Sequence, residues 1–181
     1  MSLHQGNDQL GIATAPRTVR IERLLPGPVE RVWAYLTDSE KRGKWLAKGP
    51  MADHAGGPVE LTFRHSELST APTPEKYRKY EGHRNVGKVI RCEPPAYLSF
   101  TWEEGNGAAS EVSFELQAAG GDTLLTLTHS RLADHGAMVS VASGWHTHLS
   151  VLINVLNGAE TADFWSKLEH LEAEYDRALP A

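Results

Sequence analysis

One stretch near the C-terminal end constrains the fold more than any other: residues 144–156, with the sequence GWHTHLSVLINVL. Its apolar residues Trp145, Leu149, Leu152 and Leu156 recur at spacings of four, three and four. These spacings place the four side chains on one face of a helix rather than on a strand. Because every strand-like run of the chain precedes this stretch, we predict a late helix that packs onto a completed sheet.

The part of the chain before this helix alternates apolar and polar residues, as half-buried strands do. We predict strands at residues 17–25, 58–64, 86–92, 97–103 and 111–117. A Gly120-Gly121-Asp122 turn then leads into a last strand, which carries Leu125 and Leu127 on one face. The strands after residue 86 therefore form an antiparallel meander with one apolar face.

Helices are expected at two places. After the first strand, Pro28 suits a first helical turn, and apolar residues recur at helical spacing from Val29 onward. Asp38 or Ser39 then caps a second short helix that ends near Trp45. Residues 133–156 and 161–179 form the helices at the C-terminal end, with an Asn-Gly pair between them. The order of elements predicts an α+β fold.

Composition limits the class of protein. A chain of 181 residues is the size of one domain, and we expect a flexible segment at residues 1–16 followed by a single domain at residues 17–181. A net charge of −5 disfavours nucleic-acid partners, and no apolar run is long enough for membrane insertion. The single cysteine, Cys92, and the polar N-terminus without signal-peptide features favour a cytoplasmic location.

Five sequence blocks, in order, resemble those of the SRPBCC superfamily, and more closely its branch related to the C-terminal domain of the activator of heat-shock-protein-90 ATPase. The blocks are PVERVWAYLTDSEKRGKWL, GGPVELTF, GKVIRCEPPAYLSFTW, TLTHSRL and GWHTHLSVLINVL. The resemblance implies the helix-grip fold, in which a curved antiparallel sheet wraps around a long C-terminal helix and encloses a hydrophobic cavity. Relatives include lipid carriers, polyketide cyclases and chaperone regulators, so the fold alone does not determine the activity.

Side chains expected to line this cavity lie on the inward faces of the strands and of the late helix. They are Trp45, Phe63, Phe100, Trp102, Phe114, Leu127, His129, Trp145, His148, Leu149 and Leu152. The alternative is that these side chains fill a solid core, as most buried aromatic residues do. Residues 66–85 form a long excursion between strands, and their Tyr77-Arg78-Lys79-Tyr80 cluster is placed to cover a ligand.

Histidines are the candidate reactive groups. His129 and His148 are expected to face inward, where either one would orient a ligand, act as an acid or base, or simply satisfy a core hydrogen bond. His146 lies two residues from His148, which is about 200° around a helix, so the pair cannot chelate one metal ion. We expect His146 to face solvent or the last helix. The sequence contains no metal, cofactor or nucleophile motif that would assign catalytic residues.

Three functions therefore remain open. The first is binding of a small hydrophobic or amphipathic ligand between the sheet and the C-terminal helix, without a cofactor. The second is an enzymatic reaction of the cyclase, dehydratase or hydrolase type in the same cavity, with His129 or His148 as the acid or base. The third is a protein-interaction domain like the chaperone regulators. A homodimer and a contact with a chaperone are the expected protein partners.

Overall fold

The computed structural model describes residues 6–102 and 109–181. The strands are β1 (Ile12–Ala15), β2 (Thr18–Leu25), β3 (Pro58–Thr62), β4 (Arg84–Glu93), β5 (Tyr97–Trp102), β6 (Ser110–Ala119) and β7 (Asp122–Ser130). The α-helices are α1 (Val29–Thr37), α2 (Ser39–Arg42), α3 (His135–Leu156) and α4 (Phe164–Ala178). Two 3₁₀ helices, η2 (His65–Glu67) and η3 (Glu75–Tyr80), lie between β3 and β4.

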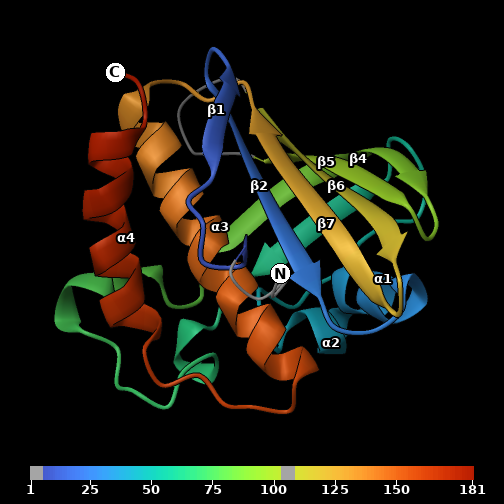
Figure 1. Cartoon of the computed structure of the whole chain (residues 1–181), viewed down its shortest axis with the longest axis horizontal. Helices are drawn as coiled ribbons and strands as arrows, with labels where there is room; N and C mark the ends of the chain where they lie inside the picture. The colour runs from blue at the N-terminus through green and yellow to red at the C-terminus, as the bar shows by residue number, and fades with distance from the viewer. Residues whose placement is uncertain (1–5, 103–108) are drawn as a thin grey trace.

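The strands form one antiparallel sheet in the order β1-β2-β7-β6-β5-β4-β3. The sheet is curved and does not close into a barrel (Figure 1). Every second residue of β7 is buried, and Leu125 and Leu127 pair with Leu116 and Phe114 of β6. One apolar face therefore points inward, which confirms the predicted α+β helix-grip fold.

Helix α3 crosses the inner side of the sheet, and α4 packs along α3 (Figure 1). The helix begins where the Asp134 side chain accepts a hydrogen bond from the Ala137 backbone N–H at 2.8 Å. Trp145, Leu149 and Leu152 are buried against the sheet side, as their spacing predicts. Because α4 covers another face of α3, that face is buried too, and the polar residues on it need partners within the protein.

The two short helices are α1 and α2, but α2 ends earlier than predicted. Its last residue is Arg42, not the region of Trp45, and the Arg42 side chain is only 1% exposed. The guanidinium donates hydrogen bonds to the backbone carbonyls of Leu36, Ala47 and Gly49. The chain after α2 therefore wraps around a buried cation and does not continue as a helix.

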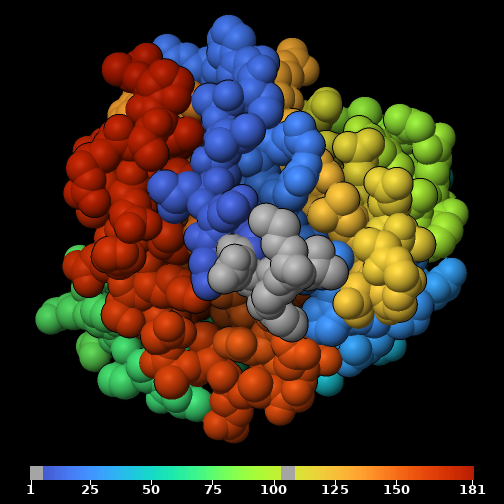
Figure 2. Space-filling model, in the orientation of Figure 1, coloured from blue at the N-terminus to red at the C-terminus, as the bar shows by residue number. Residues whose placement is uncertain are grey.

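Part of the N-terminal segment, which was expected to be flexible over residues 1–16, pairs with the rest of the fold. Residues 12–15 form the extra strand β1, which the prediction did not include. The Gly11 N–H donates to the Tyr175 hydroxyl of α4 at 2.7 Å, and the Asn7 side chain makes two hydrogen bonds with the Leu24 backbone. Figure 2 shows this segment lying on the surface beside α4. Residues 1–5 of the expected flexible segment lie outside the described residues.

Strand boundaries shift slightly from those expected. β3 ends at Thr62, β4 begins at Arg84 within the expected excursion, and β5 ends at Trp102. Glu103, the last residue of the predicted strand at residues 97–103, lies outside the described residues. The excursion between β3 and β4 therefore covers residues 63–83, begins and ends slightly earlier than the predicted residues 66–85, and contains η2 and η3.

Candidate functional site

A cavity of about 440 Å³ lies where the excursion between β3 and β4 meets α3 and α4. Its lining side chains come from the ends of β3 and β5, from the excursion, from the start of β4 and from both long helices. They are Phe63, His65, Tyr77, Tyr80, His83, Asn85, Trp102, Ser140, Gly144, His148, Phe164, Trp165, Leu168 and Glu172. The wall is therefore mainly aromatic, with a few polar groups, as is usual for small-molecule sites.

A smaller hollow of about 130 Å³ continues this cavity toward the core. Five lining residues belong to both spaces, namely Phe63, Trp102, Ser140, Gly144 and His148. The inner space is closed by Leu46, Val141 and Trp145. A different hollow of about 560 Å³ beside β1 has no aromatic ring in its lining and is bordered by residues 13–17 and by the C-terminal residues Pro180 and Ala181. We therefore take the aromatic cavity as the candidate site.

His65 lies at the centre of the aromatic wall. Its ring stacks on Phe63 with 5.4 Å between centroids, and the rings of His148, Phe164 and Trp165 lie 5.4–5.6 Å away. These contacts join β3, η2, α3 and α4 at one point. Burial lowers the pKa of His65, and the nearby charge of Glu81 opposes this shift. The ring is therefore favoured in its neutral form inside the cluster.

His148 has a defined tautomer. Its Nδ1 lies 2.9 Å from the backbone carbonyl of Trp45, which can only accept, so Nδ1 carries the proton. The other nitrogen, Nε2, is then a hydrogen-bond acceptor, in a ring that lines both parts of the cavity. Burial lowers the pKa of His148 to about 3, and the neighbouring His65 adds to this effect. His148 is thus a neutral acceptor near pH 7 and a weak proton-accepting base.

Several buried polar atoms of the cavity wall and of the excursion lack a hydrogen-bond partner among the described residues. Two belong to lining residues, His65 Nδ1 and Trp165 Nε1, and two belong to the excursion, Thr73 Oγ1 and Glu81 Oε1. Each such atom costs folding free energy, of the order of 1–3 kcal/mol. The fifth atom of this kind in the described chain, Arg23 Nε, belongs to β2. The cavity wall therefore contains two of the five buried polar atoms that lack a partner among the described residues.

His129, the first candidate acid or base, is part of the core and does not line the cavity. The Trp145 indole N–H donates to His129 Nδ1 at 3.0 Å, which leaves the proton on Nε2. Nε2 then donates to Ser110 Oγ at 2.7 Å, and Ser110 Oγ donates to the Trp102 carbonyl at 3.1 Å. Burial lowers the pKa of His129 to about 3. The arrangement is that of a satisfied core histidine.

The predicted lining residues divide into two groups. Phe63, Trp102, Trp145 and His148 line the cavity or its inner part. The remaining seven are Trp45, Phe100, Phe114, Leu127, His129, Leu149 and Leu152, which are buried in the core. Three of these seven border only a void of about 10 Å³. The space between the middle of the sheet and α3 is therefore filled with side chains, and the cavity lies at one end of it.

The two histidines of the HxH stretch turn to different neighbours. His148 faces the cavity, whereas His146 Nδ1 lies 2.8 Å from the Tyr175 hydroxyl of α4. Of the two positions expected for His146, solvent or the last helix, the structure shows the second, and the residue is buried. Within residues 6–102 and 109–181, no three His, Cys, Asp or Glu side chains are grouped as metal ligands.

Sequence reasoning missed the contribution of α4, which supplies Phe164, Trp165, Leu168 and Glu172 to the wall. The adjacent Phe164-Trp165 pair at the start of this helix was the available signal. The Tyr77 and Tyr80 side chains of the excursion, which were expected near a ligand, do line the cavity. Tyr77 also stacks on Trp165, with 4.6 Å between ring centroids.

The sequence model of the family described as "Activator of Hsp90 ATPase homolog 1-like protein" matches residues 26–157. The structure resembles a protein of Bordetella parapertussis solved by NMR, with 43% identity, 95% of this chain and 93% of that chain covered, and a TM-score of 0.80. No curated protein matches the sequence.

Two more distant structures share the fold. CalU16 from Micromonospora echinospora is 24% identical, with 94% of this chain and 95% of that chain covered and a TM-score of 0.70. DynU16, a protein of the dynemicin biosynthetic locus, is 22% identical, with 80% and 48% covered and a TM-score of 0.64. In this chain, none of the helices within the described residues is long and apolar enough to cross a bilayer.

Proposed function

Since the chain belongs to the activator of Hsp90 ATPase homolog 1-like family of the SRPBCC superfamily, whose members often bind ligands in a cavity, we propose that it binds a small, mostly apolar molecule. The binding site is the aromatic cavity between the excursion, α3 and α4. The main observation in favour is the cavity itself: about 440 Å³ of space surrounded by rings from five elements. Ligand sites for small molecules typically occupy about 300–1,000 Å³.

The unsatisfied wall supports the proposal. A chain selected only for stability would be expected to fill this space or to pair the buried polar atoms of His65 and Trp165. Local departures from good packing and pairing are common at functional sites. The free-energy cost of leaving these groups unpaired is consistent with a site that is completed by a ligand.

The excursion would form the entrance to the site. Tyr80 of η3 is 44% exposed although its side chain lines the cavity, so it lies at the boundary between the cavity and solvent. Loop segments of this kind have fewer backbone constraints than strands and commonly control access to ligand sites. We expect the ligand to enter past Tyr77 and Tyr80 and to reach Phe63 and Trp102.

The enzymatic alternative is less well supported by the geometry. His129 donates and accepts within the core, and His148 has a pKa far below neutrality, whereas an effective base has a pKa near the working pH. In this proposal His148 orients the ligand by accepting a hydrogen bond. The half-buried lone Cys92 is consistent with a reducing cytoplasmic location.

Gly144 offers a direct test. A Cβ atom added at Gly144 meets no heavy atom within 4 Å, because the residue faces the cavity from α3. We expect Gly144→Leu to fill the cavity while the fold is retained. Gly136→Leu is the matched control, because Gly136 lies on the same helix at an exposed position outside the cavity lining.

The measurement is native mass spectrometry after incubation with an apolar metabolite extract. The wild type and Gly136→Leu should retain a small molecule, and Gly144→Leu should lose it. Circular dichroism and thermal unfolding establish that all three proteins are folded. Equal retention by Gly144→Leu, or no retention by the wild type, would contradict binding in this cavity.

A further inference from the structure

We propose that the preferred ligand is a protonated amine carried on an apolar body, and that Glu172 binds its ammonium group. This inference rests on the proposed function, because it names the ligand class of the same cavity. It follows from the polar groups that the wall presents and from the charges that it lacks.

Glu172 of α4 is the one carboxylic side chain among the described lining residues, and those residues include no lysine or arginine. The side chain is half-buried. Burial raises the pKa of Glu172, the charge of Glu169 raises it further, and Lys76 opposes both effects. The ionised form is thus destabilised in the empty protein, and a cation placed in the cavity would relieve this cost.

Lys76, the nearby cation, is engaged outside the cavity. Its ammonium group forms an ion pair with Glu169 and lies 4.9 Å from the centre of the Tyr77 ring. Both partners of this ion pair are more than half exposed at their side chains. Lys76 is thus paired with Glu169, and Glu172 forms no ion pair with any other described residue, so its carboxylate remains available to a ligand.

His148, a second polar group of the wall, is also an acceptor, whereas the unpaired indole N–H of Trp165 is a donor. Because Nδ1 of His148 donates to the Trp45 carbonyl, Nε2 presents a lone pair, and no described group bonds to it. A ligand that carries N–H or O–H donors matches both Glu172 and His148. A carboxylate ligand would bring further acceptors toward them and would be desolvated beside an existing negative charge.

The aromatic wall favours the same class of ligand. The rings of Trp102, Phe164 and Trp165 border the cavity, and aromatic faces attract cations through their quadrupoles. Around a carboxylate, such rings provide an apolar site that retains some attraction for a positive charge. The apolar body of the ligand would then occupy the inner space next to Phe63.

Three probes of equal chain length test this inference: octylamine, octanol and octanoate. At neutral pH the first is a cation, the second is neutral and the third is an anion. Isothermal titration calorimetry should give a dissociation constant for octylamine at least about tenfold lower than that for octanoate, with octanol between them. In Glu172→Gln, octylamine should bind no more tightly than octanol.

Glu174→Gln is the matched control, because it removes the same charge from the same helix two residues away and Glu174 does not line the cavity. It should keep the preference for the amine. If octanol binds but octylamine shows no advantage, or if Glu172→Gln keeps that advantage, the charge inference is overturned while the cavity function stands. If none of the three probes binds, the proposed function fails and this inference fails with it.

Discussion

At the scale of single residues, the interior of this protein depends on neutral histidines. His129, His146 and His148 are each buried, and burial is the main reason that the pKa of each falls to about 3. Hydrogen bonds also fix the position of each ring. His129 bonds to Ser110 and Trp145, His146 bonds to Tyr175, and His148 bonds to the Trp45 carbonyl. The interior therefore tolerates these histidines only without a charge.

The first prediction concerns acid. Between the ordinary histidine pKa of 6.5 and about 3, the unfolded chain binds protons that the folded chain does not. The free energy of unfolding must then decrease as the pH falls through this range. Each of the three histidines contributes at most one proton to the difference in proton binding between the unfolded and folded chains. One such proton changes the free energy of unfolding by about 1.4 kcal/mol per pH unit.

Urea unfolding at several pH values measures this slope. His148→Asn keeps an amide N–H for the Trp45 carbonyl but cannot take up a proton. The free energy of unfolding of the variant should fall less steeply with decreasing pH than that of the wild type. The difference between the two slopes should correspond to the uptake of about one proton. Identical slopes for the two proteins would contradict the assignment of His148 as a buried neutral group.

A second prediction at this scale tests the His129 network. Trp145→Phe keeps an aromatic ring but removes the indole N–H, so His129 Nδ1 loses its donor in a buried place. We expect a loss of about 1–3 kcal/mol in the free energy of unfolding, on top of the smaller change in packing. Trp33→Phe is the control, because Trp33 is only half-buried on α1 and should cost less. Equal costs would argue against the network.

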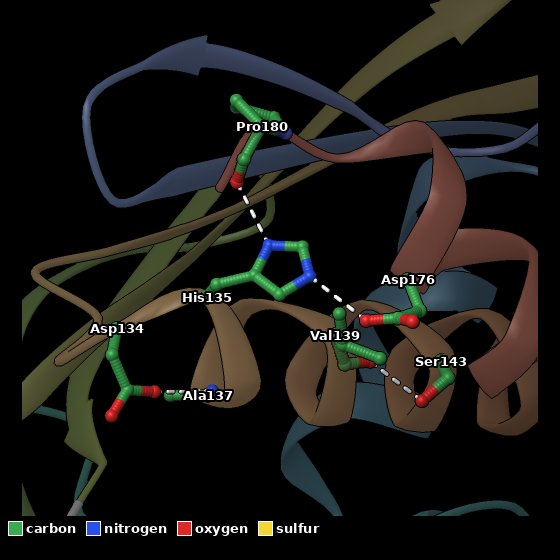
Figure 3. Close-up of polar contacts among 7 residues, drawn as sticks. All are labelled: Asp134, His135, Ala137, Val139, Ser143, Asp176 and Pro180. Carbon is green, nitrogen blue, oxygen red and sulfur yellow. Dashed lines mark hydrogen bonds and ion pairs between the residues drawn. The ribbon is translucent and has the colours of Figure 1, made fainter.

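At the scale of elements, one histidine joins the start of α3 to the end of α4 (Figure 3). His135 Nδ1 lies 2.8 Å from the Pro180 carbonyl, and Nε2 lies 3.0 Å from the Asp176 carboxylate. Both partners are acceptors, so the contact is complete only when the ring carries two protons. The pKa of His135 is accordingly raised, first by the Pro180 carbonyl and then by Asp176.

The third prediction follows from this sign. Because the pKa of His135 is higher in the folded than in the unfolded chain, its protonation stabilises the fold. This stabilisation is complete below the unfolded-state pKa of 6.5 and is lost as the pH rises through the folded-state pKa. His135→Gln should therefore lower the Tm more at about pH 6 than at about pH 8.5, measured as a difference from the wild type. Asp176→Asn should show the same trend more weakly. A Tm difference that is independent of pH would contradict the double contact.

Most elements were predictable because apolar periodicity reports local geometry. The alternation along β6 and β7 and the stripe that contains Trp145 correctly identified the buried faces. Strand β1 was missed because four residues are too few for a period to appear. The end of α2 was missed because it depends on the carbonyls of Ala47 and Gly49, in the loop after the helix, which converge on the Arg42 guanidinium. Convergence of this kind cannot be read from spacing.

At the scale of the whole molecule, the cavity lies beside the packed core between the sheet and α3 and not within that core. Phe100, Phe114 and Leu149 fill the space between the sheet and α3, whereas the opening lies beside α4 and the excursion. A side chain that fills a core and one that lines a cavity are of the same apolar residue types, and both occupy inward-facing positions of a strand or helix. The sequence therefore identified inward-facing residues but not which of them border empty space.

The contribution of α4 was hidden for a related reason. The helix itself was predicted at residues 161–179, but the neighbours of its side chains depend on how α4 folds back along α3. Only that packing brings Trp165 against Tyr77 of the excursion and Phe164 near His148. A site assembled from segments this distant in sequence is a property of the complete fold.

The location of a bound ligand is the most direct test of this account. In an NMR titration of the wild type with octanol, the indole N–H signals of Trp102 and Trp165 should shift, because both rings line the cavity. The signal of Trp45, whose indole N–H donates to the Tyr35 carbonyl in the core, should remain in place. A shift of Trp45 without a shift of Trp165, or no shift of any tryptophan, would contradict the proposed site.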